Sequence, residues 1–307
     1  MSGDRFARPP AAALEWAGGV TGRRVVSAAA MSGGMSTATH RLLLEGGDSI
    51  VMRRFVNRPW VQRDPYLAAR EAAVLRHLES TAVPAPPLIG VDPSGERCGA
   101  LAVLMGLMPG RRRAPADARS LGQLARALAE IHDCPPVSGL PNATDLLLRA
   151  FQEGLPIRPE DEAPPSPVLW SLVRERRAAA ELGAPALIHN DFSHSNVLFA
   201  RGRLSAVIDW GEAAAGQAAC DVSFCRVNLT LTLGSEPADL LLAAYEAEIG
   251  GSVPGRAWWD LVAAARVEPD LGTWAASANY LGPPGLSAIQ VRRRFTEFVD
   301  AAVAATS

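Results

Sequence analysis

The chain has 307 residues, of which 48% are hydrophobic and 20% are charged, and its formal net charge is −2. This balance is typical of a globular chain and not of a disordered one, and the length suffices for one large core or two linked lobes. The near-neutral charge and the lack of a basic, aromatic-rich stripe argue against nucleic acid as a partner. No apolar run approaches the roughly 18 residues that span a bilayer, so we expect no membrane association.

The N-terminal sequence lacks the apolar core of a signal peptide, and the four cysteines are scattered without pair spacing. Neither a disulfide framework nor a zinc site is indicated, and we expect a cytoplasmic protein. The chain contains no lysine, so all 30 side chains of the Lys and Arg class are arginines. Any side-chain cation of that class that grips a phosphate should therefore be permanently charged and fork-shaped.

The first hundred residues predict a small β-rich lobe with one long helix. Residues 10–18 favour a short leading helix, and 65–79 a longer one with apolar residues at helical spacing. The expected strands cover residues 23–30, 40–44, 49–55, 88–91 and 100–104. Residues 31–38 form a glycine-containing loop between the first two strands, and Gly46 and Gly47 suit a hairpin turn with positive φ.

Beyond a linker at residues 107–110 the pattern becomes mainly helical. The expected helices cover residues 121–132, 145–152, 166–182, 220–233, 238–249, 257–276 and 287–305, and Pro269 should break or kink the sixth of them. Residues 196–200 and 204–210 predict a β-hairpin in the middle of this part. We therefore expect an N-terminal lobe over residues 1–105, a hinge at 106–110 and a C-terminal lobe over 111–307.

The polar residues around this hairpin carry the clearest chemical signal. His189, Asp191 and Asn196 lie in a loop before it, and Asp209 lies at its far end. Carboxylate and amide oxygens that converge in this way suit Mg²⁺. If Asn196 and one aspartate hold the metal, the other aspartate can orient a hydroxyl group for phosphoryl transfer. The alternative is a polar turn whose side chains satisfy backbone amides, and the distant second acid weighs against it.

This pattern, His-x-Asp-x-x-x-x-Asn followed by Ile-Asp-Trp, resembles the aminoglycoside phosphotransferase and choline kinase-like family of small-molecule kinases. The resemblance implies an α+β, bilobal protein kinase-like fold, with a five-stranded antiparallel sheet plus a helix in the small lobe and a mostly α-helical large lobe. It implies ATP and Mg²⁺ as cofactors, with GTP not excluded. By the same resemblance, Asp191 is the catalytic carboxylate, Asn196 and Asp209 hold Mg²⁺, and His189 and Asp221 are structural. We expect Asp221 to act as an N-cap or loop brace, and His194 to be exposed without a role.

The resemblance also implies a nucleotide site in the small lobe. Ser32, Gly33, Gly34 and Ser36 correspond to the phosphate-binding loop, although paired glycines alone mark ordinary turns more often. Val51 and Arg53 share one face of a strand, so Val51 would meet the adenine and Arg53 the phosphates. Arg53 replaces the usual lysine, and Glu71 is its expected ion-pair partner; the alternative is a solvated strand end. Met105 and Leu107 flank Gly106 in the expected hinge.

The phosphate acceptor is less well indicated. Glu212, Glu268, Asp270 and the acidic residues 160–162 could line a pocket for a cationic acceptor. Trp258, Trp259 and Trp274 could line a more apolar pocket, although a place in the core is the simpler expectation for each. An antibiotic such as an aminoglycoside or macrolide, or a metabolite of choline, homoserine or sugar type, remains open as the acceptor. A nucleotide-binding pseudokinase is the alternative function, a protein kinase is disfavoured by the short segment after Asp209, and we expect a monomer or weak homodimer.

Overall fold

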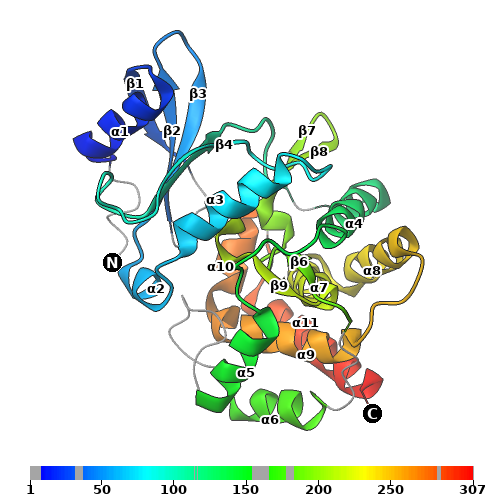
Figure 1. Ribbon diagram of the computed structural model, residues 1–307. Coiled ribbons are helices and arrows are strands. Elements are labelled where there is room, and N and C mark those ends of the chain that lie inside the picture. Colours follow the sequence, from blue (N-terminus) through cyan, green and yellow to red (C-terminus); the bar gives the residue numbers. More distant parts are fainter. Residues whose placement is uncertain are drawn as a thin grey trace. The chain divides into compact units, whose positions relative to one another are not determined.

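The computed structural model describes residues 8–31, 37–113, 115, 117–153, 166–177, 183–281 and 285–306. The chain divides into two compact units. The first comprises Met1–Met108 together with Asp209–Glu212, and the second comprises Pro109–Ile208 together with Ala213–Ser307. The first unit is built around a sheet and the second is mostly helical (Figure 1). None of the described helices is both long and apolar enough to cross a membrane.

The sheet of the first unit is antiparallel, with its five strands in the order β1-β2-β3-β5-β4. The strands are β1 (Val25–Ala30), β2 (Thr37–Leu44), β3 (Ser49–Phe55), β4 (Leu88–Asp92) and β5 (Ala102–Gly106). The turn between β2 and β3 contains Gly46 and Gly47, whose φ angles of 93° and 96° are those that glycine adopts without steric cost. This turn was predicted from the sequence and is confirmed.

Strand β5 ends two residues later than expected, because Met105 and Gly106 remain paired with β3. Met105 lies opposite Val51, and Gly106 lies opposite Ile50. The backbone N–H of Gly106 also donates to the carbonyl of Pro87 at 2.9 Å. Gly106, the first residue of the expected hinge segment, is therefore a strand residue, and its N–H is already used within the unit.

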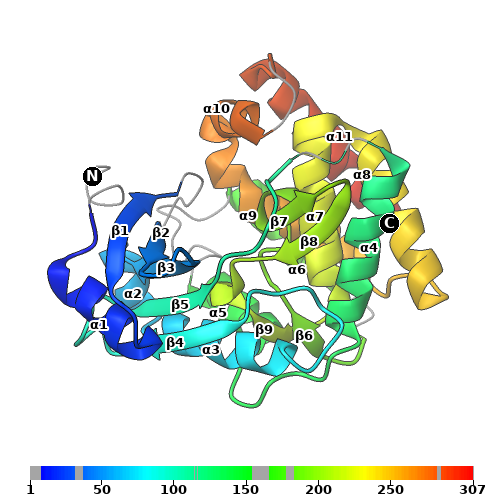
Figure 2. The same ribbon diagram turned by 90° about the horizontal axis from the view of Figure 1, so that it is seen from above.

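Helices α1 (Ala11–Thr21) and α3 (Leu67–Leu78) lie against the sheet of the first unit (Figures 1 and 2). Trp16 of α1 packs into a cluster with Met52 and Leu104, which lie on one face of the sheet. Since neighbouring residues of a strand point to opposite faces, Arg53 points to the other face. The short helix α2 (Arg58–Arg63) was not predicted, although Asn57 caps it by accepting from the Trp60 N–H at 3.2 Å.

The second unit is organised around helix α7 (Ala218–Leu233), which packs against α8, α9 and α11. Residues 219–232 are all buried, which explains why this helix has no polar face. The other helices are α4 (Ala118–His132), α5 (Ala143–Glu153), α6 (Pro167–Glu175), α8 (Ser235–Ile249), α9 (Arg256–Val267), α10 (Leu271–Leu281) and α11 (Ala288–Ala305). The predicted break at Pro269 is confirmed, because a 3₁₀ turn, η4 (Glu268–Asp270), separates α9 from α10.

Two short strand pairs complete the second unit (Figure 2). The predicted hairpin is present as β7 (Val197–Ala200) and β8 (Arg203–Val207). Strand β8 ends at Val207, three residues before the predicted end, so Ile208 and Asp209 follow it. The second pair, β6 (Ala186–Ile188) with β9 (Ala214–Gly216), was not predicted. Strand β6 leads directly into the polar loop that begins at His189.

Candidate active site

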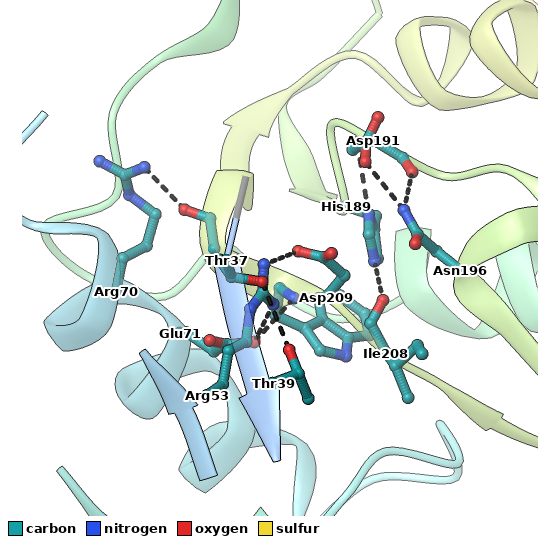
Figure 3. A network of polar contacts seen from close by, with 12 residues as sticks. Thr37, Thr39, Arg53, Arg70, Glu71, His189, Asp191, Asn196, Ile208 and Asp209 are labelled. Atoms are coloured by element: carbon teal, nitrogen blue, oxygen red, sulfur yellow. Dashed lines mark hydrogen bonds and ion pairs between the residues drawn. The ribbon is translucent and has the colours of Figure 1, made fainter. Parts of the chain in front are cut away.

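Arg53 is held between two carboxylates of the first unit (Figure 3). Arg53 projects its side chain from β3, and the residue is only 6% exposed. One guanidinium nitrogen donates to Glu71 Oε1 of α3 at 2.7 Å, and the other donates to Asp209 Oδ1. The predicted Arg53–Glu71 ion pair is therefore present, whereas the contact with Asp209 was not foreseen.

Helix α3 holds the segment that contains Asp209. The backbone N–H of Trp210 donates to Glu71 Oε1 at 3.2 Å, and Arg70 donates to the Gly211 carbonyl at 2.9 Å. Asp209 itself has a φ of 74°, in the left-handed region that few side chains adopt. Two neighbouring residues of α3 thus fix the two residues that follow Asp209. Arg70 was missed from the sequence, because the carbonyl that it binds lies 141 residues away.

The charges around Arg53 favour its ionised form. Among the side chains of Arg53, Glu71 and Asp209, that of Asp209 is the most exposed. Burial alone would lower the pKa of Arg53, but the carboxylates of Asp209 and Glu71 raise it above its usual value. Burial raises the pKa of Glu71, and Arg53 opposes that shift. The side chain of Asp209 is 29% exposed, compared with 7% for Arg53 and 1% for Glu71. Asp209 is therefore the carboxylate that can reach a ligand in solvent.

In the second unit, His189 connects the polar loop to the end of the β7–β8 hairpin (Figure 3). Its Nε2 lies 2.9 Å from the carbonyl of Ile208, and its Nδ1 accepts from the Asp191 N–H at 3.3 Å. Because a carbonyl can only accept, Nε2 carries a proton in this contact. The fully buried His189 ring thereby ties Asp191 to the residue that precedes Asp209.

Asn196 is oriented by Asp191. Its side-chain nitrogen donates to the backbone carbonyl of Asp191 at 2.9 Å and to its Oδ2 at 2.8 Å. The nitrogen is thereby used, and among the described residues no hydrogen bond reaches the amide oxygen. The backbone carbonyl of Asn196 accepts from the Ile208 N–H at 2.9 Å, which links Asn196 to the residue beside Asp209.

Each unit carries side-chain oxygens of the kind that a small, hard cation binds. Mg²⁺ prefers amide and carboxylate oxygens. Asn196 and Asp191 carry them in the second unit, and Asp209 carries a carboxylate in the first. Among the described residues no group of three or more His, Cys, Asp or Glu side chains could hold a metal ion.

Asp221 braces the polar loop from helix α7. Its carboxylate accepts from the backbone N–H groups of His189 and Asn190, both at 2.7 Å, and lies 3.3 Å from Nε2 of His132. Burial would raise the pKa of Asp221, but the contacts with His132 and His189 hold it below its usual value. The expected N-cap role is wrong, because Gln217 occupies that position and Asp221 lies in the first helical turn. The bracing contacts themselves are present.

The sequence predicts that His194 is exposed, and this prediction is wrong. It lies in the 3₁₀ turn η2 (His194–Asn196) and is only 4% exposed. Burial lowers its pKa to about 4, so the ring is neutral near pH 7. The polar residues around His194 favoured a surface loop, but the side chain of His194 is buried within the 3₁₀ turn η2.

The remaining predicted nucleotide residues fall into two groups. Val51 and Met105 are nearly buried and lie opposite each other on β3 and β5, and Leu107 follows β5 and is partly exposed. The predicted phosphate-loop residues Ser32, Gly33, Gly34 and Ser36 lie outside the described residues.

The predicted acceptor residues are only partly brought together. Glu268 and Asp270 share the turn η4, where Glu268 Oε2 accepts from the Ser166 N–H at the start of α6 at 2.6 Å. Glu212 and Trp274 are partly exposed. Trp258 and Trp259 are each 1% exposed, so both belong to the core, and the simpler expectation for them is confirmed. Residues 160–162 lie outside the described residues.

Solved structures place this architecture in the protein kinase-like fold. A provisionally named aminoglycoside phosphotransferase from Ralstonia eutropha JMP134 is 18% identical, with 97% of this chain and 98% of that chain covered and a TM-score of 0.63. Macrolide 2′-phosphotransferase MphH from Brachybacterium faecium is 19% identical, with 89% and 97% covered and a TM-score of 0.58. A thermostable mutant of aminoglycoside phosphotransferase APH(4)-Ia, in a ternary complex with ADP and hygromycin B, is 14% identical, with 95% and 97% covered and a TM-score of 0.59.

The sequence itself defines the family. Residues 27–262 match the profile described as the phosphotransferase enzyme family, and the chain belongs to that family. It is therefore a phosphotransferase that acts on the hydroxyl groups of small molecules. Among curated proteins, no relative matches the chain significantly.

Proposed function

We propose that this phosphotransferase uses Mg-ATP and transfers the terminal phosphate to a hydroxyl group of a small molecule, with Asp191 as its catalytic carboxylate. The observation that carries this assignment is the bond between Asn196 and Asp191. It turns the amide nitrogen of Asn196 toward the Asp191 carboxylate and leaves the amide oxygen available to a cation. The ADP bound to the related APH(4)-Ia structure supports an adenine nucleotide as the donor.

In the proposed reaction, the acceptor hydroxyl donates a hydrogen bond to Asp191. Its oxygen forms a bond to the terminal phosphorus while the bond between that phosphorus and the bridging oxygen of ADP breaks, and the hydroxyl proton passes to Asp191. Asn196 and Asp209 would hold Mg²⁺, which neutralises charge on the phosphates when it is bound. His189, with its proton on Nε2, keeps the Asp191 backbone in place.

Arg53 gives the proposed nucleotide site its cation. The guanidinium is buried between Glu71 and Asp209, and it can grip phosphate oxygens as the usual lysine does. The absence of that lysine was the only support for a pseudokinase. Because Arg53 makes the ion pair expected of the lysine, this alternative is not favoured.

The acceptor class is the open part of the proposal. Hygromycin B, which is bound in the APH(4)-Ia complex, and the macrolide phosphotransferase activity for which MphH is named support an antibiotic as the acceptor. A screen of ATP consumption against aminoglycosides, macrolides, choline, homoserine and sugars decides between an antibiotic and a metabolite.

The test of the mechanism is Asp191→Asn, assayed with the best acceptor from that screen. We expect turnover to fall about 100-fold or more, since a positioned acid–base group contributes roughly that factor. Binding of Mg-ATP, measured by calorimetry, should change less than about threefold. Asp145→Asn, which alters an exposed carboxylate of α5, is the matched control. Full turnover by Asp191→Asn would overturn the assignment of the catalytic carboxylate, and a wild-type protein that binds no nucleotide would overturn the proposed function.

A further inference from the structure

Asn190, the residue between His189 and Asp191, has an unusual backbone conformation. Its φ is 62°, in the left-handed region where a side chain other than glycine is strained. Asparagine tolerates this region better than most residues, but the surrounding structure must still hold it there. The conformation of Asn190 decides in which direction the chain enters Asp191.

Arg266, near the end of α9, holds Asn190 at two points. One guanidinium nitrogen donates to the backbone carbonyl of Asn190 at 2.6 Å, and the other donates to its side-chain Oδ1 at 3.2 Å. A planar guanidinium presents its donors in a fixed fork, so it fixes the backbone and the side chain of Asn190 relative to each other. A lysine could not make both bonds with the same geometry.

The position of Arg266 is itself fixed by the core. The residue is only 4% exposed, and its guanidinium carbon lies 4.4 Å from the centre of the Phe224 ring on α7. Cys220, also on α7, lies 3.6 Å from Asn190 Oδ1 and 3.9 Å from Arg266. Both helices therefore contribute to the surroundings of Asn190.

The peptide unit between Asn190 and Asp191 is held at both ends. Its carbonyl oxygen accepts from Arg266, and its N–H donates to Nδ1 of His189. Fixing both atoms fixes the plane of this peptide, and with it the start of Asp191.

We infer that Arg266 is a positioning residue for phosphoryl transfer, which holds Asn190 in its left-handed conformation and thereby aims the Asp191 carboxylate at the acceptor. The inference rests on the proposed role of Asp191. Arg266 touches neither substrate in this scheme and acts through Asn190. Its loss should therefore affect turnover and leave nucleotide affinity in place.

The first test compares Arg266→Met with Arg256→Met, which removes an arginine from the opposite end of the same helix. Arg256 pairs with Asp260 and provides the matched control. We expect Arg266→Met to lower kcat about tenfold or more, since displacing a reacting group by about 1 Å can cost up to 100-fold. The KM for ATP should change less than about twofold, and Arg256→Met should retain wild-type kcat. Arg266→Lys should fall between wild type and Arg266→Met. A higher KM for ATP with an unchanged kcat would overturn the inference. Equal falls in kcat in both methionine variants would also overturn it.

The second test is a double-mutant cycle with Asn190→Gly. Glycine adopts a positive φ without support. With glycine at position 190, the left-handed conformation therefore no longer depends on Arg266. We expect Arg266→Met to cost about tenfold in kcat with Asn190 present and less than about threefold with Gly at position 190, which is a measurable coupling. Equal costs in the two backgrounds would show that Arg266 acts through packing against Phe224, and the inference would be wrong.

The third test does not depend on activity. Hydrogen exchange followed by mass spectrometry reports on the amides of Asn190 and Asp191, which are bonded to Asp221 and His189. Arg266→Met should speed exchange in the peptide that covers them by about tenfold, because its local opening becomes easier, and Arg256→Met should not. Unchanged exchange would overturn the inference even if the enzyme is active. If the wild-type protein transfers no phosphate but exchange rises as expected, the proposed function fails while the positional role of Arg266 stands.

Discussion

Arg53 and Glu71 form a buried ion pair, with 2.7 Å between a guanidinium nitrogen and Glu71 Oε1. The pair joins strand β3 to helix α3, and it leaves the other side of the guanidinium to Asp209. A single arginine therefore positions both a helix and a proposed metal ligand.

Replacing Arg53 should weaken ATP binding. Arg53→Ala removes charge-assisted hydrogen bonds, each contributing about 1.5–3 kcal/mol, so we expect the KM for ATP to rise about tenfold or more. Arg53→Lys keeps the charge but not the forked donors. Its KM for ATP should lie between those of wild type and Arg53→Ala. Arg41→Ala, at an exposed arginine of the neighbouring strand, is the control. Steady-state kinetics at saturating acceptor measures the effect, and a KM equal to that of wild type would reduce Arg53 to a scaffold residue.

Asn196 should determine the requirement for magnesium. Asn196→Ala removes the amide oxygen proposed as a ligand and the hydrogen bonds to Asp191. Loss of a group that ligates or orients in a metal site typically costs about 10- to 100-fold in metal affinity. We expect the Mg²⁺ concentration for half-maximal activity to rise by at least about tenfold. Asn228→Ala deletes another nearly buried asparagine, bonded within α7. If the two variants shift the Mg²⁺ titration equally, the proposed ligand role is wrong.

Asp221 should make stability depend on pH in the acid range. Its pKa is lowered in the folded state, so its contribution is fully present above the ordinary value of about 3.9 and is lost as the pH falls through the folded-state value. Asp221→Asn leaves the backbone N–H groups of His189 and Asn190 with a weaker acceptor, and we expect a loss of about 2–4 kcal/mol at pH 7.

Thermal unfolding of wild type and Asp221→Asn at pH 7, 5 and 3.5 measures this dependence. The difference between the two melting temperatures should be largest at pH 7 and 5, and should begin to narrow at pH 3.5. Asp145→Asn should follow the wild-type curve at every pH. A difference that stays constant over this range would show that the charge of Asp221 contributes nothing to stability.

Much of the fold could be predicted from residue patterns. The period of Leu67, Leu75 and Leu78 indicated helix α3, and Pro269 indicated the break between α9 and α10. Strands β6 and β9 escaped prediction, because each has three residues and carries no readable alternation. Helix α2 could have been found, because Asn57 and Pro59 form a capping signal.

The proposed roles of Asp191, Asn196 and Asp209 rest on residue types at a fixed spacing, which the sequence shows directly. Contacts between distant residues were not predictable. Nothing around Arg266 distinguishes it from any arginine on a helix, because its partner Asn190 lies 76 residues away. The burial of His194 was also unpredictable, because a 3₁₀ turn determines its direction and the sequence shows only a polar run.

The first unit is not a continuous stretch of chain, since it combines Met1–Met108 with Asp209–Glu212. A fragment that ends at Met108 would carry Arg53 and Glu71 but would lack Asp209 and Trp210. Arg53 would lose one of its two carboxylate partners, and Glu71 would lose the backbone N–H from which it accepts a hydrogen bond. A split protein divided at this boundary would thus separate a nearly buried arginine from half of its partners, and only a fragment that also supplies residues 209–212 restores them.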